Sequence, residues 1–406
     1  MLLGAVEPVP PRPLTLDECV AQALQHNPDL QLALRKVEGV EAGYQEHRTK
    51  ILPRFLAQAG YVRGGGPASE ALNFNQARLV VVQPLFTGGR LGSAAGQVRA
   101  RLASAKQDFG ELRNEIIFNV KRAYYEVLQG REVVEILRQS VSRLENIQSL
   151  VSRRAQARSV IRLDFLKTEA QLLDQKQVLL EAETALTLAE NKFNVMLGWE
   201  AREPLQLVDL ATAPAVDLAS LETYISQAES KRLVYLKARE DLTAAEMGFA
   251  SVLAESRPEL AFQGSYGYSG RQVSSMEKDW NGQVSAVLPL WSAGESTLKA
   301  EQAKSVVEQA KISMVTAKIR LREEVTEAYL SVKLDQAKSV SAKKALEAGE
   351  EGERVADVLY REGSISTVDL LRAQTDLTRA KMDHTKAQHD LFRSLAQLDW
   401  STGIAL

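Results

Sequence analysis

The feature that most constrains this chain is an internal duplication. The stretch from Pro84 to Arg90, PLFTGGR, returns 205 residues later as PLWSAGE, from Pro289 to Glu295. The same offset joins further pairs without a gap: Pro53 and Pro258, Tyr61 and Tyr266, Tyr124 and Tyr329, Asp164 and Asp369, Leu166 and Leu371, and Gly198 and Gly403. Chance would not keep one offset at so many positions, so we predict two tandem structural repeats, residues 15–210 and 218–406.

Each repeat is predicted to contain a helix, a β-hairpin, a very long helix and a further helix. The first helix begins after Thr15, a good N-cap residue followed by acidic residues, and reaches about His47. Asn27-Pro28 is expected to split off a short leading segment. The second repeat has no proline there, so the interruption is not required to recur.

The hairpins, residues 53–88 and 258–293, are identified by alternation. Leu260, Phe262, Tyr266 and Tyr268 fall on one face of a strand, and small or polar residues fall on the other. The first repeat keeps this parity with Phe55, Ala57, Ala59, Tyr61, Leu79 and Val81. The three glycines from Gly64 lack the lysine of a phosphate-binding loop and are interpreted as a hairpin tip.

The long helix of the first repeat spans residues 89–157, which contain no proline. Its apolar positions recur as in a heptad, for example at Val120, Val127, Val134 and Val141. About 69 residues at 1.5 Å each would extend roughly 100 Å. After a short turn, a helix of half that length is predicted from Leu163 to Leu197.

Composition excludes several classes of protein. No run of eighteen apolar residues could form a transmembrane helix, whereas alternating transmembrane strands would leave hydropathy almost unchanged. A net charge of −2 gives no reason to expect a nucleic-acid partner. Cys19 is the only cysteine and is expected to be a thiol in a helix core. His384 and His389 fall on different helix faces, which argues against a histidine metal site. We therefore expect that the protein binds no metal or cofactor and is not an enzyme.

Four strands cannot close a barrel, because membrane barrels need at least about eight. Alone, the two hairpins would expose open edges and aromatic side chains, which oligomerisation would resolve. Two chains would supply eight strands and three would supply twelve. The alternatives are hairpins packed on a soluble core, or a soluble structural coiled-coil scaffold that leaves the hairpins unexplained. Dependence on detergent would distinguish a membrane protein from such a scaffold.

Several stretches resemble the TolC-type outer-membrane efflux protein family over nearly the whole chain. They run from Leu14 to Pro28, from Gln83 to Arg90, from Leu288 to Gly294 and from Tyr360 to Leu371. The resemblance implies a mainly α homotrimer with a long helical periplasmic tunnel and a 12-stranded transmembrane β-barrel, four strands per chain. Residues 198–217 and the chain ends would form an equatorial region.

The resemblance also implies a function and a location. The chain would be the passive exit duct of a tripartite efflux or type I secretion system, placed in the outer membrane and extending into the periplasm. A periplasmic adaptor and an inner-membrane transporter would be its partners. Residues 1–13 lack the basic and apolar regions of a signal peptide, which fits a cytosolic protein or one whose signal peptide has been removed.

The same resemblance assigns candidate site residues. Asp369, with Arg372 in place of a second acid, would line a constriction at the periplasmic mouth, although Asp369 also fits a helix-capping box. Gly363 and Ser364 would form the tip of one helix turn, with a positive φ at the glycine. At the other turn Arg158 stands in the place of Gly363, and together with Arg154 it makes that turn basic, which fits an adaptor contact or a solvated helix end. The corners between strand and helix would use Pro84, Gly88, Pro289 and Gly294.

If the basic turn binds an adaptor, reversing its charge should weaken export. We expect Arg158→Glu to reduce drug or metal export in cells, because complementary charges at an interface control encounter and register. Export can be measured as resistance or substrate accumulation at matched protein levels. Unchanged export would contradict the docking role and favour a solvated helix end.

Overall fold

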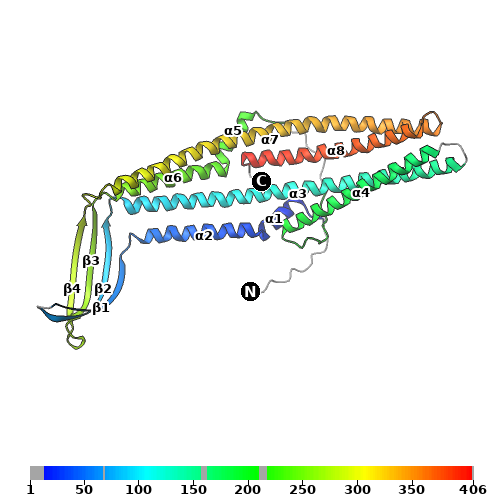
Figure 1. Cartoon of the computed structure of the whole chain (residues 1–406). Coiled ribbons are helices and arrows are strands. Elements are labelled where there is room, and N and C mark those ends of the chain that lie inside the picture. The colour runs from blue at the N-terminus through cyan, green and yellow to red at the C-terminus, as the bar shows by residue number, and fades with distance from the viewer. Residues whose placement is uncertain (1–12, 67–68, 157–161, 210–216, 405–406) are drawn as a thin grey trace. The chain divides into compact units, whose positions relative to one another are not determined.

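The computed structural model describes residues 13–66, 69–156, 162–209 and 217–404. Its elements follow the same order in both halves (Figure 1). The first half contains α1 (Leu16–His26), α2 (Pro28–Thr49), β1 (Arg54–Gly66), β2 (Ser69–Phe86), α3 (Arg90–Gln156) and α4 (Arg162–Leu197). The second half contains α5 (Leu221–Lys231), α6 (Leu233–Ala254), β3 (Glu259–Gly270), β4 (Glu277–Val287), α7 (Glu295–Arg361) and α8 (Thr367–Thr402).

Each helix of the second half begins 205 residues after its counterpart. The two longest, α3 and α7, both have 67 residues, and α4 and α8 both have 36. Among the described residues, no helix is long and apolar enough to cross a membrane. The limits of the repeats themselves, 15–210 and 218–406, stay a prediction.

The break between α1 and α2 lies at the predicted position. Asn27 has an extended backbone (φ −68°, ψ 119°), and Pro28 opens α2, where its missing N–H costs nothing. The Asn27 side-chain oxygen accepts hydrogen bonds from the amides of Asp29 and Leu30, at 2.9 and 3.1 Å. The sequence therefore ends one helix and starts the next with local interactions alone.

The same break recurs in the second half, where no proline requires it. Arg232 separates α5 from α6 with nearly the same backbone angles (φ −69°, ψ 120°). Its side chain is only 3% exposed, and its guanidinium lies 2.7 Å from Glu111, 3.5 Å from Glu324 and 4.0 Å from the ring centre of Trp400. Burial raises the pKa of Glu111, although the Arg232 charge opposes this. Tertiary partners thus replace the proline.

One compact unit comprises Met1–Gln31, Glu111–Arg232 and Arg320–Leu406. In its first core cluster, Cys19 of α1 packs with Tyr124 of α3 and with Phe193 and Leu197 of α4. Cys19 is fully buried, which confirms the expected core thiol, and burial raises its pKa to about 12. The thiol is therefore held in its unreactive, protonated form.

The predicted equatorial segment, residues 198–217, is only partly described, because 210–216 lie outside the described residues. Leu207 forms an isolated parallel bridge with Leu14. The Tyr124 hydroxyl donates a 2.6 Å hydrogen bond to the carbonyl of Val208. These contacts attach the segment after α4 to the residues just before α1 and to α3.

The other unit, Leu32–Gly110 and Leu233–Ile319, contains one antiparallel sheet of order β1-β2-β3-β4. The register places Phe55 opposite Val81, Leu79 opposite Tyr266, and Tyr266 opposite Trp280. The alternating apolar positions of all four strands therefore share one face, as the parity predicted. The face is open: Phe55 is 77% exposed and Trp280 is 76% exposed.

The opposite face of the sheet carries polar groups. Arg78 of β2 donates to Asp279 of β4 across the intervening β3. Gly267 lies between them in the register, and a Cβ there would come within 2.1 Å of the Ala77 carbonyl. A strand without a side chain at this point lets the ion pair span two strand spacings.

The contacts of Arg232 with Glu111, Glu324 and Trp400 yield a stability prediction. Arg232→Ala should lower the free energy of unfolding by about 3 kcal/mol, because it leaves the partly buried Glu111 carboxylate without its cation. Chemical denaturation of the purified protein in detergent measures this loss. Arg322→Ala is the matched control, because it removes an exposed ion pair with Glu229 and should cost less than about 1 kcal/mol. Equal losses for the two variants would contradict the prediction.

Candidate functional site

The turn between α7 and α8 is closed by Gly363. Its φ is +78°, the left-handed conformation that the sequence required there. The Gly363 amide donates to the Tyr360 carbonyl at 3.1 Å, and the Ser364 amide donates to the Leu359 carbonyl at 2.8 Å. These bonds satisfy two of the carbonyls at the end of α7 and reverse the chain within a few residues.

Asp369 takes part in a capping box at the start of α8. One carboxylate oxygen, Oδ2, accepts from the Ser366 hydroxyl at 2.6 Å and from the Ser366 amide at 3.1 Å. In return, the Asp369 amide donates to the Ser366 hydroxyl at 3.3 Å. The capping alternative for Asp369 is therefore present in the structure.

The same contacts favour the charged form of Asp369. The hydrogen bond from the Ser366 hydroxyl lowers its pKa most, the Ser366 amide lowers it further, and the charge of Arg372 adds a weaker lowering. Both Asp369 and Arg372 are exposed, and no ion pair joins them within the described part of the chain. The turn thus presents an ionised carboxylate whose second oxygen, Oδ1, accepts no hydrogen bond from Ser366.

A buried cluster holds this turn in place. Tyr360 at the end of α7 is 3% exposed and Leu370 at the start of α8 is 1% exposed. They pack with Leu144 and Val151 of α3 and with Leu172 of α4. The backbone of the turn is thereby positioned by apolar contacts from four helices.

The other turn, between α3 and α4, is largely outside the description. Arg158 lies among residues 157–161, which are not described, and Arg154 belongs to α3 but its side chain is likewise outside the described residues. The basic turn therefore stays a prediction from the sequence.

The first corner, between β2 and α3, depends on Gly88. Pro84 lies at a shift in the strand register, and Gly88 follows with a φ of +60°. The Arg257 guanidinium donates to the Gly88 carbonyl at 2.9 Å, and a Cβ on Gly88 would come within 2.6 Å of the Arg257 Cβ. Glycine is required here both by the backbone and by the neighbouring side chain.

The second corner, between β4 and α7, has a similar backbone conformation, but fewer side chains cover it. Ala293 and Gly294 have φ values of +51° and +87°, and nothing surrounds Gly294 within 4 Å of an added Cβ. Leu290 and Trp291 are 88% and 86% exposed. The first corner is therefore covered by neighbouring side chains, whereas the second corner is exposed in the single chain.

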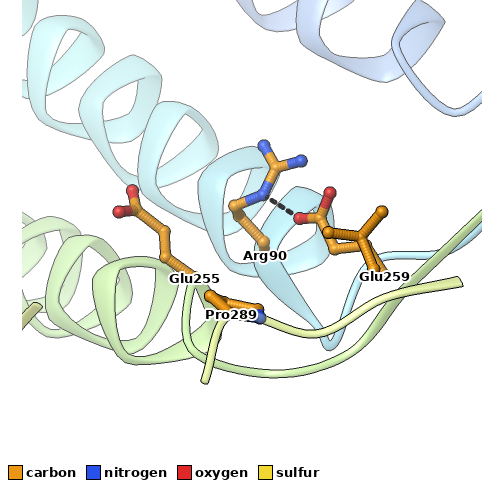
Figure 2. Close-up of a pocket in the computed structure, with 5 residues that line it drawn as sticks. Arg90, Glu255, Glu259 and Pro289 are labelled. Atoms are coloured by element: carbon orange, nitrogen blue, oxygen red, sulfur yellow. Dashed lines mark hydrogen bonds and ion pairs between the residues drawn. The ribbon is translucent and has the colours of Figure 1, made fainter. Parts of the chain in front are cut away.

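A shallow pocket lies between these corners, lined by Pro289 and Val287 and by Arg90, Glu255 and Glu259 (Figure 2). The Arg90 side chain donates to Glu259 at 2.6 Å, which joins the start of α3 to the start of β3. The pocket is the surface of a structural joint. No group of three or more potential metal ligands occurs among the described residues.

Comparison with known proteins decides the assignment. The family model described as "Outer membrane efflux protein" matches residues 19–199 and 224–403, most of the chain. The chain belongs to this family. The expected outer-membrane efflux channel and outer-membrane location are thereby confirmed, and the family is one of channel proteins rather than enzymes.

Individual relatives agree over most of the chain. It is 23% identical to outer membrane protein TolC of Vibrio cholerae, covering 96% of this chain and 90% of the relative. It is 22% identical to protein CyaE of Bordetella pertussis, covering 89% and 78%. The solved CmeC outer membrane channel of Campylobacter jejuni is 18% identical, with a TM-score of 0.86 over 96% of this chain and 85% of that one. The predicted TolC-like fold class is confirmed.

Gly363 yields a prediction about the turn. Gly363→Ala should lower the free energy of unfolding by about 1–2 kcal/mol, because an L-residue is strained at a φ of +78°. Gly352→Ala, within the exposed face of α7, should raise it by about 0.5–1 kcal/mol. Denaturation of both variants in detergent compares them directly. The turn assignment would be wrong if both substitutions were stabilising.

Proposed function

We propose that three copies of this chain form the passive exit duct of a tripartite efflux or type I secretion system. The sheets would combine into a twelve-stranded barrel in the outer membrane, and the helices would enclose a tunnel through the periplasm. A periplasmic adaptor and an inner-membrane transporter would deliver the substrate. The duct itself would supply a path and no energy.

The observation that carries this proposal is the open apolar face of the sheet. Phe55, Leu79, Tyr266 and Trp280, one from each strand, lie on that face, and all are more than half exposed. In water such a face would favour aggregation, whereas lipid would cover it. The opposite face carries the Arg78–Asp279 pair and suits a wet lumen.

A soluble coiled-coil scaffold accounts for the long helices only. It gives no reason for an apolar sheet face with two open edges. No contact in the described structure covers that face with a helix or loop of the same chain, so the membrane duct is the better explanation.

We further propose that Asp369 has two roles at the mouth of the duct. Its carboxylate caps α8, and its charge would contribute one third of an acidic ring in the trimer. Three carboxylates in a narrow opening attract cations and repel one another, which would tune selectivity. Arg372, one turn further along α8, would moderate that charge.

The exposed turn at Gly363 and Ser364 would contact the adaptor, together with the basic turn at Arg154 and Arg158. Both turns join a 67-residue helix to a 36-residue helix, at matching positions in the two halves. A partner that docks onto the end of the duct would meet both of them.

Single-channel recording in planar bilayers tests the duct and the gate separately. The wild-type protein should form a cation-preferring pore, and Asp369→Asn should weaken that preference by removing charge. Ser366→Ala is the matched control, because it breaks the capping box but keeps the carboxylate. Absence of any pore would refute the duct, whereas unchanged selectivity in Asp369→Asn would remove only the gate role.

A further inference from the structure

Within one chain, the two halves meet at an internal joint where β2 and α3 lie against α6 and β3. Two contacts define this joint: Arg90 pairs with Glu259 at 2.6 Å, and the Gln97 side chain covers Gly248, where an added Cβ would be 2.4 Å from its amide nitrogen. The strands β2 and β3 also pair directly, with Leu79 opposite Tyr266.

The 205-residue offset relates β2 and α3 to β4 and α7, and it relates β3 and α6 to β1 and α2. We call these two counterparts the free sides of the chain. Arg90 corresponds to Glu295, and Glu259 corresponds to Arg54, so both signs are exchanged and the pair stays complementary. Gln97 corresponds to Gln302 and Gly248 to Gly43, so both residue types are kept. Both contacts could therefore form again, but only between β1 and α2 on one side and β4 and α7 on the other.

Burial shows that these counterparts are uncovered in the single chain. Residues Ala100, Ala244 and Ala254 at the internal joint are 5%, 6% and 1% exposed. Their counterparts, Ser305, Gly39 and Thr49, are all exposed. Gly43 likewise has no atom within 4 Å of an added Cβ. The two free sides of the chain thus carry the residues that make the contacts of the internal joint, but in the single chain no partner surface covers them.

We propose that a second copy of this chain completes the joint through an ion pair between Arg54 of one copy and Glu295 of the next. Gln302 of one copy would cover Gly43 of the next. The strand β4 would pair with β1 of the neighbour in the register that places Val284 opposite Tyr61. This inference rests on the proposed oligomeric duct and specifies the residues at its seam.

The described contacts leave these groups available. The Arg54 side chain is exposed and makes no hydrogen bond or ion pair with a described residue. Among the described residues, the Glu295 side chain pairs with Lys299 alone, one turn along the same helix, at 2.9 Å and with both side chains exposed. The proposed register would also continue the apolar face, because Val284 and Tyr61 both lie on it.

Cysteine cross-linking tests the seam in the assembled protein. In a Cys19→Ser background, Arg54→Cys combined with Glu295→Cys should give covalent dimers and trimers with a short bismaleimide on denaturing gels. The control is Arg90→Cys with Glu259→Cys, the counterpart pair inside one chain, which should cross-link without joining chains. Each single cysteine variant should give no ladder.

Charge exchange gives a second readout. Arg54→Glu or Glu295→Arg alone should lower the temperature at which the oligomer dissociates, and the double variant should regain most of that loss. Lys299→Ala controls for the local pair of Glu295. Native mass spectrometry separates the failures: a trimer without the Arg54–Glu295 cross-link would overturn the seam alone, whereas a monomer in detergent would overturn the proposed duct.

Discussion

The structure depends on an antiparallel sheet that a single chain cannot complete. Four strands leave the backbone groups of β1 and β4 unpaired at the two edges, and an apolar face open along all of them. Hydrogen-bonding groups in a membrane must all be satisfied, so the sheet is stable there only when further strands close it. The need for further strands and for lipid therefore follows from the same element.

The corners between strand and helix fix where the long helices begin relative to the sheet. Each strand pair is followed by two consecutive positive-φ residues, and α3 or α7 starts directly afterwards. At the first corner, Arg257 and Glu259 fasten the turn within the chain. At the second corner the counterparts of these two residues, Leu52 and Arg54, are exposed. The exchange of charge signs between the Arg90–Glu259 pair and its counterparts Glu295 and Arg54 is the basis of the proposed second, complementary surface.

At the far end of the helices, local bonds set the shape of the turn. Gly363 and the Ser366–Asp369 box reverse the chain, and a cluster including Tyr360 and Leu370 fixes its position. Capping and the proposed charged lining do not compete for Asp369, because the hydrogen bonds from Ser366 favour the ionised carboxylate and leave it exposed. One residue can serve both purposes because the cap occupies only one of its oxygens.

The sequence by itself determined the elements and their order. The offset, the strand parity and the break at Asn27-Pro28 were readable, because each depends on spacing or on local backbone preference. The positive φ of Gly363 followed from the family resemblance, and the burial of Cys19 from the apolar character of its thiol. Only the tertiary structure decided the break at Arg232, where Glu111, Glu324 and Trp400 converge from distant parts of the chain. It also revealed which side of each repeat is covered, since burial depends on neighbours that no local pattern records.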